Sequence, residues 1–165
     1  FSMFDSTIVG YRRSEVAPEA PYNEMTTNIT EAVTGSDVVI CVLPLTDETR
    51  GVLDKRVFDA MAGALFVNVG RGAVADEKAL YDALESGYLR GAAIDTWYNY
   101  PAPGEKSCAP ANHPIHKLPN VLLSPHLGGY TSKAVAASVR EIFEKTDFYL
   151  REGRFPEEVD LNMQY

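Results

Sequence analysis

The segment ALFVNVGRG, from Ala64 to Gly72, is a short apolar run followed by an arginine between two glycines. Two later segments have a similar layout: GAAID ends in Asp95, and NVLLSPH ends in His126. Short apolar runs closed by turn residues are typical of buried parallel strands. Because the carboxyl ends of such strands meet at one edge of a sheet, we expect Arg71, Asp95 and His126 to lie in one ligand site.

The remaining chain alternates between strand and helix patterns. Further strands are predicted at Ser6–Tyr11 and Asp37–Leu45, and helices at residues 29–34, 55–61, 77–86 and 131–151. Asp76 is a suitable N-cap for the third of these helices, and Gly87 a suitable end. The long segment from Asn99 to Lys117 is rich in Pro, Gly and Ala and is predicted to be a functional loop. The βαβ alternation predicts an α/β fold with a doubly wound parallel sheet.

Composition narrows the class of partner. The chain has 165 residues, 45% of them hydrophobic, which is enough for a single core. Its formal net charge of -8 disfavours nucleic acid and anionic membrane surfaces, because both would be repelled. The apolar stretches are too short for a membrane span. Cys41 and Cys108 have no spacing suited to a metal site, so no metal is expected. A soluble cytoplasmic protein is the default.

The segments NVGRG, DTWYNYP and SPHLGG, in this order and spacing, resemble the D-isomer-specific 2-hydroxyacid dehydrogenase family over nearly the whole chain. The resemblance implies a Rossmann-like NAD(P)-binding domain and a homodimer. It also implies an oxidoreductase that transfers hydride between a nicotinamide cofactor and a small 2-oxo or 2-hydroxy acid, such as glyoxylate or hydroxypyruvate.

One part of that fold is missing from the sequence. A dinucleotide fold opens with a strand and a G-x-G-x-x-G turn, and neither is found here. We therefore expect residues 1–152 to be a partial dinucleotide-binding domain, preceded by further residues in the parent protein. The missing strand is expected between the Ser6–Tyr11 strand and the strand at 64–69. Residues 153–165 resemble a tail that returns to an absent substrate domain.

Arg71 and His126 are the predicted catalytic pair. The planar guanidinium of Arg71 matches a carboxylate, and the resemblance implies that it holds the 2-oxo acid. His126 can exchange a proton near neutral pH, since an ordinary histidine has a pKa of about 6.5. His113 and His116 lie in the long loop without such context and are interpreted as surface residues.

The sequence GYRRSE favours NADP over NAD as the cofactor. Dinucleotide folds that bind NAD place an acidic residue near the end of the second strand, where it accepts hydrogen bonds from the ribose. Here Arg12 stands at about that place and is followed by Arg13 and Ser14, a set that suits a 2'-phosphate. The alternative is a solvated turn that carries two arginines.

The resemblance also assigns contacts with the cofactor to residues at the other strand ends. The pattern P-L-T-x-x-T-x-G supports a cofactor role for Leu43, Pro44 and Thr49, the alternative being an ordinary strand-to-helix turn. Asp95 would bind the nicotinamide carboxamide, the alternative being a cap of local amides. The remaining predicted cofactor residues are Val69, Gly70 and Gly128.

Tyr100 marks a departure from the family pattern D-V-F-x-x-E-P, in which a glutamate charges the catalytic histidine. Losing that carboxylate makes the imidazolium less favourable and weakens carbonyl reduction at neutral and higher pH. Two hypotheses supply a substitute: Tyr100 orients His126 through its hydroxyl, or Glu105 folds back from the loop.

Two other functions stay open. DTWYNYPAP with the pair His113 and Pro114 also resembles formate dehydrogenases, which have glutamine where this chain has Tyr100. Against that alternative, the histidine loop reads PHLGG and not P-H-x-S-G. The third alternative is a non-catalytic dinucleotide sensor, similar to the transcriptional corepressors that share this fold.

Overall fold

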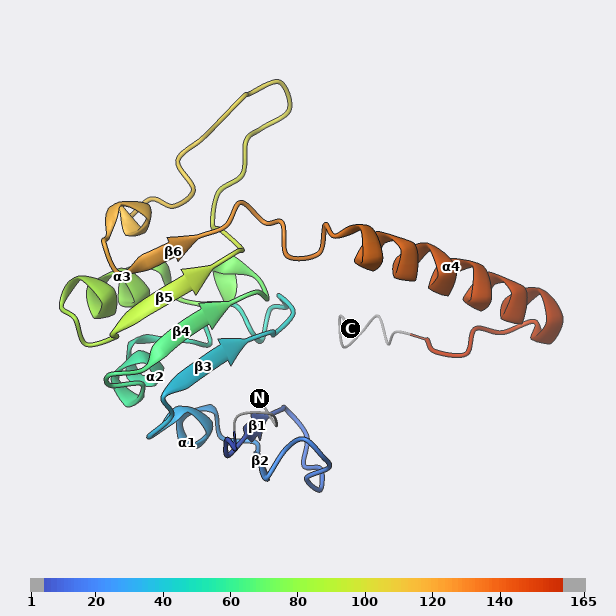
Figure 1. Ribbon diagram of the computed structural model, residues 1–165, viewed down its shortest axis with the longest axis horizontal. Helices are drawn as coiled ribbons and strands as arrows, with labels where there is room; N and C mark the ends of the chain where they lie inside the picture. Colours follow the sequence, from blue (N-terminus) through green and yellow to red (C-terminus); the bar gives the residue numbers. More distant parts are fainter. Residues whose placement is uncertain (1–4, 159–165) are drawn as a thin grey trace.

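A four-stranded parallel sheet organises the molecule, whose computed structural model describes residues 5–158. Its strand order is β3 (Val38–Cys41), β4 (Leu65–Asn68), β5 (Gly91–Ile94) and β6 (Val121–Leu123). The register aligns the strand ends, since Cys41 pairs with Asn68, Asn68 with Ile94, and Ile94 with Leu123. The carboxyl ends therefore form one level edge, and the predicted α/β fold with a parallel sheet is confirmed (Figure 1).

A second, two-stranded parallel sheet pairs β1 (Val9–Tyr11) with β2 (Glu24–Thr26). The sequence analysis missed β2, a strand of three residues between loops. It also expected a missing strand beside the strand at 64–69, and this is wrong, because β4 is paired on both sides, with β3 and β5. Within residues 5–158, β3 is hydrogen-bonded on one side only and lies nearest to β1 and β2 (Figure 1).

Three helices follow the strands and begin at side-chain caps. They are α1 (Ile29–Val33), α2 (Lys55–Ala60) and α3 (Glu77–Glu85), capped by Asn28, Asp54 and Asp76. Asp76 accepts the backbone N–H of Ala79, as predicted, and Gly87 just beyond the helix has a φ of 73°. Short 3-10 helices lie at η2 (Gly72–Val74) and η3 (Ile115–Lys117).

The hydrophobic core joins these helices to the sheet. Phe58 of α2 meets Phe66 of β4 edge to face, with ring centroids 5.4 Å apart, and Leu80 of α3 is also buried. The expectation that all three apolar runs are buried fails at β6. Leu122 and Leu123 are 72% and 46% exposed, because β6 is the outer strand of the sheet and its apolar side chains are left largely uncovered.

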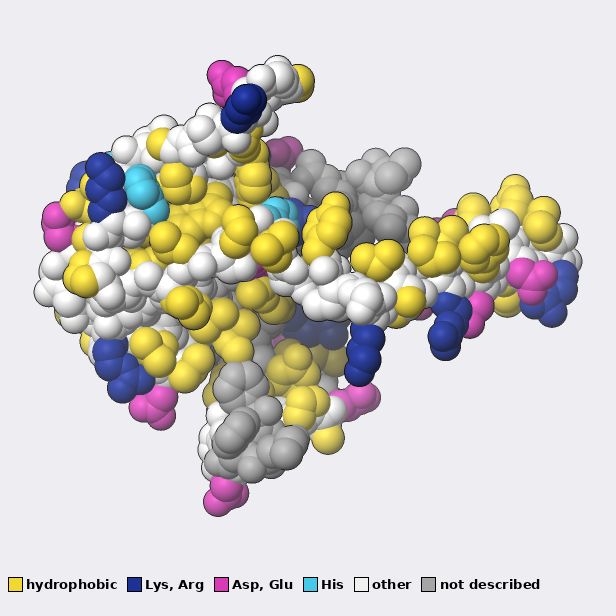
Figure 2. All heavy atoms as spheres, turned by 45° about the horizontal axis from the view of Figure 1, so that its top comes forward, with side chains coloured by type: hydrophobic (Ala, Val, Ile, Leu, Met, Phe, Trp, Pro, Cys, Tyr) yellow, Lys and Arg dark blue, Asp and Glu magenta, His cyan; other side chains and the backbone are white. Residues whose placement is uncertain are grey.

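Helix α4 (Ser132–Glu152) extends away from the sheet (Figure 1). It buries no residue, although it is amphipathic, and its exposed apolar residues include Val135, Val139, Ile142 and Phe143. Figure 2 shows hydrophobic side chains along one side of this helix and charged side chains along the other. Among the described residues no helix is long and apolar enough to cross a membrane.

Candidate functional site

The level edge of the sheet brings the three predicted residues onto adjacent strands. Arg71 follows β4, Asp95 directly follows β5, and His126 follows β6. Since Asn68, Ile94 and Leu123 are partners in the strand register, the segments after them emerge side by side. This is the edge at which parallel α/β sheets bind ligands.

Asp95 holds the loop that carries His126. Its carboxylate is buried and accepts the backbone N–H of Leu127 at 2.9 Å and that of Gly128 at 3.0 Å. The backbone of His126 itself has a φ of 59°, a left-handed conformation that costs free energy in a residue other than glycine. Two hydrogen bonds from the next two residues oppose that cost. The amides that Asp95 binds are distant in sequence, so they are not the local amides of the alternative considered for Asp95.

Electrostatics at Asp95 agree with this arrangement. A hydrogen bond from the Ser124 side chain lowers the pKa of Asp95, burial opposes it, and the amides of Gly128 and Leu127 and the charge of His126 lower it further. These groups all stabilise the ionised carboxylate. A fixed negative charge therefore lies behind the histidine loop.

Tyr100 contacts His126, as the first hypothesis requires. The Tyr100 hydroxyl lies 3.1 Å from Nδ1 of His126, and the two ring centroids are 5.7 Å apart. The same hydroxyl accepts the backbone N–H of Trp97 at 3.0 Å. The Trp97 indole in turn donates to the carbonyl oxygen of Ser124 at 2.9 Å, so one buried residue connects both segments.

Glu105 does not reach the histidine. Its carboxylate accepts the backbone N–H of Ala102 at 3.2 Å, within the tip of the long loop. The side chains of that tip, residues 101–109, are all exposed. The hypothesis that Glu105 replaces the missing carboxylate partner is therefore wrong in this conformation.

Arg71 is exposed, and its guanidinium donates to the carbonyl oxygen of Gly70 at 2.7 Å. The flanking glycines let the backbone of neighbouring loops approach closely. A Cβ on Gly70 would lie 2.6 Å from the backbone oxygen of Leu43, and one on Gly72 would lie 2.4 Å from that of Trp97. The turns after β3, β4 and β5 are thus packed directly on one another.

The turn after β3 is closed by its own threonines. The Thr49 hydroxyl donates to the carbonyl oxygen of Pro44 at 2.7 Å and accepts the backbone N–H of Thr46 at 2.8 Å. Thr49 therefore has a structural role of its own, and its predicted contact with the cofactor is not tested. Leu43 is half-buried beside Gly70, whereas Val69 is 47% exposed at the sheet edge.

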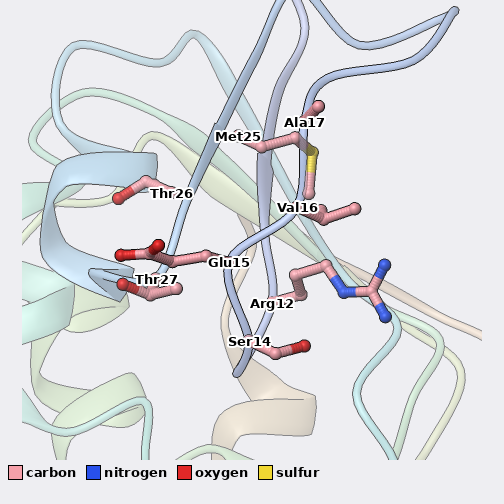
Figure 3. Close-up of a pocket in the computed structure, with 8 residues that line it drawn as sticks. All are labelled: Arg12, Ser14, Glu15, Val16, Ala17, Met25, Thr26 and Thr27. Atoms are coloured by element: carbon pink, nitrogen blue, oxygen red, sulfur yellow. The ribbon is translucent and has the colours of Figure 1, made fainter.

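A cavity of about 490 Å³ lies beyond β1 and β2. It is lined by Arg12 and Ser14, two of the predicted cofactor residues, and also by Glu15, Thr26 and Thr27, which the sequence analysis did not single out. Figure 3 shows the side chains of Arg12 and Glu15 pointing to opposite sides of the loop. Arg13 is not among the lining residues and forms an ion pair with Glu48 at 3.4 Å.

The base of the long loop is fixed by Glu77, a residue that the sequence analysis passed over. This half-buried carboxylate at the start of α3 accepts the backbone N–H of His113 and lies 3.1 Å from both the His113 ring and the Asn112 amide. Asn99 donates to Asn112 at 3.3 Å. His113 is thus a structural contact and not a simple surface residue, and the loop that carries Tyr100 is anchored at its far end.

The donors that line the cavity beside β1 suit a dinucleotide. The part of the chain that the structure describes has no group of three or more His, Cys, Asp or Glu side chains that could hold a metal ion. Arginine, hydroxyl and carboxylate groups line the cavity beside β1 instead, and these suit phosphate and ribose oxygens.

Residues 1–128 match the family model described as D-isomer specific 2-hydroxyacid dehydrogenase, NAD binding domain. The chain belongs to this family. It is 36% identical over 123 residues to the mitochondrial formate dehydrogenase of Solanum tuberosum, a match covering 74% of the chain and 30% of that protein. It is 40% identical over 114 residues to glyoxylate/hydroxypyruvate reductase B of Enterobacter sp. (strain 638), covering 68% of the chain and 32% of the relative.

Solved structures agree with this assignment. The D-isomer specific 2-hydroxyacid dehydrogenase of Xanthobacter autotrophicus Py2, in complex with NADPH and MES, superposes with a TM-score of 0.75 at 31% identity. That match covers 95% of this chain and 62% of the other. The chain spans about a third of the length of the two curated relatives named above, so the activity of a whole protein is a matter for proposal.

Proposed function

We propose that this chain is the nucleotide-binding part of an NAD(P)-dependent oxidoreductase that interconverts a small 2-oxo acid and its 2-hydroxy acid. The observation that carries the proposal is the alignment of Arg71, Asp95 and His126 on adjacent strand ends of one sheet. A 2-oxo acid offers a carboxylate for an arginine and a carbonyl oxygen for a proton donor. Glyoxylate and hydroxypyruvate are small acids of this kind, and they are the proposed substrates because one relative is a glyoxylate/hydroxypyruvate reductase.

Each residue has a defined part in this proposal. Arg71 would exchange its contact with the Gly70 carbonyl for the substrate carboxylate, binding it through two parallel hydrogen bonds. His126 would face the reacting oxygen with Nε2, because Nδ1 is turned to Tyr100. When bound, the nicotinamide supplies or accepts the hydride. Asp95, Leu43, Pro44, Thr49, Val69, Gly70 and Gly128 would border the cofactor at the sheet edge.

The cavity beside β1 supports NADP as the favoured cofactor, with NAD as the alternative. Arg12 projects from the loop in Figure 3, and its guanidinium has no hydrogen-bond or ion-pair partner within residues 5–158. Ser14 in the same cavity adds a hydroxyl donor. Arg13 is the weaker candidate, because Glu48 already engages it. Glu15, in the same cavity, could accept hydrogen bonds from ribose hydroxyls and is the feature that speaks for NAD.

The test is oxidation of NADPH and NADH by the intact protein across a panel of small 2-oxo acids. Turnover that depends on both substrate and Arg71 is expected. A sensor of the corepressor type would instead bind NAD(P)H without substrate-dependent oxidation. Loss of turnover in Arg71→Ala, but not in Arg90→Ala at an exposed site, would separate catalysis from contamination. Absence of turnover with every acid in the panel would refute the proposal.

Formate oxidation is a second candidate, favoured by the contact between Tyr100 and His126. Formate gives up hydride to become carbon dioxide, so no proton has to leave an alcohol. A histidine paired with a neutral hydroxyl suits this chemistry better than one paired with a carboxylate. The formate dehydrogenase relative points the same way. Formate with oxidised cofactor is therefore the matched arm of the assay.

Two properties of the whole protein complete the proposal. A homodimer would cover the exposed apolar residues of α4, which the described part of the chain leaves open. Light scattering of the intact protein tests that assembly. A cytoplasmic location and a substrate domain continuing from residues 153–165 are proposed from the sequence, and cell fractionation and the intact mass of the parent protein test them.

A further inference from the structure

The hydroxyl of Tyr100 has two neighbours, and the hydrogen-bond inventory of a phenol limits how it can satisfy both. A tyrosine hydroxyl has one proton and can accept through its oxygen lone pairs. The Trp97 backbone N–H can only donate, so the hydroxyl accepts that bond at 3.0 Å. Its own proton remains available for Nδ1 of His126, 3.1 Å away.

The relative acidities of the two groups set the direction of the second bond. A phenol, with an ordinary pKa of about 10, is a stronger acid than the N–H of a neutral imidazole, and the bare imidazole nitrogen is the stronger base. Donation from Tyr100 to Nδ1 is therefore favoured over the reverse. A neutral imidazole that accepts at Nδ1 carries its proton on Nε2.

We infer that Tyr100 is a positioning residue that holds His126 as the neutral imidazole with its proton on Nε2. Asp95 fixes the backbone directly after His126 through Leu127 and Gly128, so ring and backbone are held by different residues. Tyr100 and Asp95 are titratable groups that interact with His126. Asp95 uses its carboxylate on backbone amides, whereas Tyr100 contacts the ring.

The consequence for catalysis rests on the proposed function. Nε2–H would point to the reacting oxygen as a neutral donor. Hydride transfer to a 2-oxo acid places negative charge on the carbonyl oxygen, which must then gain a proton. A neutral ring gives up its Nε2 proton less readily than an imidazolium does, and with Nε2 already protonated it has no lone pair there for the proton of an alcohol. Reduction of the 2-oxo acid and oxidation of the 2-hydroxy acid should therefore both be slow while the ring is held in this form.

The experiment is nitrogen NMR of the intact protein labelled at histidine, recorded above pH 8, well above the ordinary histidine pKa of about 6.5. The chain has three histidines, and loss of one set of signals in His126→Gln assigns them. In the native protein Nε2 should carry the proton. Tyr100→Glu, whose carboxylate can only accept, should move the proton to Nδ1. Tyr100→Phe should change the ratio of the two forms by about fivefold, the effect of one ordinary hydrogen bond.

Tyr98→Phe is the control, since Tyr98 lies in the same segment and its buried hydroxyl has no hydrogen-bond partner among the described residues. It should leave the His126 signals unchanged. Protonation at Nδ1 in the native protein, or identical tautomers in native and Tyr100→Phe, would overturn the inference. This readout needs no turnover, so it stands apart from the proposed function. Where turnover is found, Tyr100→Glu should extend 2-oxo acid reduction to higher pH.

Discussion

The Asp95 carboxylate accepts the backbone N–H of Gly128 at 3.0 Å, across 33 positions of sequence, and so links the end of β5 to the loop after β6. The adjacent Leu127 donates to the other oxygen. Asp95→Asn replaces one acceptor with an NH2 group that faces an N–H. We expect unfolding free energy to drop by about 1–3 kcal/mol, the cost of a buried donor without a partner. Denaturant melts of the intact protein check this, and an unchanged midpoint would contradict it.

The same carboxylate predicts a pH dependence of stability. The pKa of Asp95 is lowered in the folded state, chiefly by the Ser124 side chain and the loop amides. Its stabilising contribution is therefore full above the unfolded pKa, about 3.9, and is lost as the pH falls through the lower folded value. The difference in unfolding free energy between native protein and Asp95→Asn should be constant above pH 5 and shrink below pH 4. A constant difference down to pH 2 would show that ionisation of Asp95 is not involved.

Gly70 should tolerate no side chain, because backbone and not a flexible group fills the space. A Cβ there would lie 2.6 Å from the Leu43 oxygen and 3.0 Å from the Leu43 nitrogen. Gly70→Ala is expected to cost about 2 kcal/mol of unfolding free energy, as overpacking commonly does. Gly129→Ala is the control, since a Cβ on Gly129 meets no atom within 4 Å. Thermal melts of both variants decide the matter; equal shifts would count against the packing argument.

Glu77 should govern the mobility of the long loop. Its side chain is 13% exposed and accepts hydrogen bonds from Asn112 and His113. Glu77→Ala removes these contacts, and hydrogen exchange at residues 98–113 should speed up by about tenfold or more, since hydrogen bonds to charged groups contribute about 1.5–3 kcal/mol. Lys78→Ala, which breaks an exposed pair with Asp82, should change exchange there little. Equal exchange in the two variants would remove Glu77 as the anchor.

Local sequence signals located most elements, because their causes are local. The capping of α3 by Asp76 and the apolar runs at β4 and β5 involve residues close in sequence, and the observed bounds differ from those expected by a residue or so. Strand β2 was missed because three residues, Glu24–Thr26, carry too little periodicity to register. The pairing of β4 with β3, which leaves no place for a further strand beside β4, joins distant segments and leaves no mark in a local pattern.

The candidate site, like the fold, was predicted where its causes are local in the sequence. Motif spacing placed Arg71, Asp95 and His126 on neighbouring strand ends, which the strand register bears out. The left-handed backbone of His126 and the anchoring of the loop by Glu77 escaped prediction, because both arise from contacts across more than thirty positions. The Tyr100 hydroxyl contacts His126, as one hypothesis predicted. The Glu105 hypothesis failed because its carboxylate accepts the backbone N–H of Ala102, which is closer in sequence.

Cofactor preference depends on Arg12 in the cavity beside β1. Arg12→Ala removes the guanidinium and should lower kcat/KM for NADPH by about tenfold to a hundredfold, because charge-assisted hydrogen bonds to a phosphate contribute about 1.5–3 kcal/mol. NADH, which has no 2'-phosphate, should be nearly unaffected. Arg13→Ala is the matched variant, because Arg13 lies next in sequence but pairs with Glu48 at 3.4 Å. It should have the smaller effect. Steady-state kinetics with both cofactors measure this, and equal losses for NADPH and NADH in Arg12→Ala would show that Arg12 does not read the 2'-phosphate.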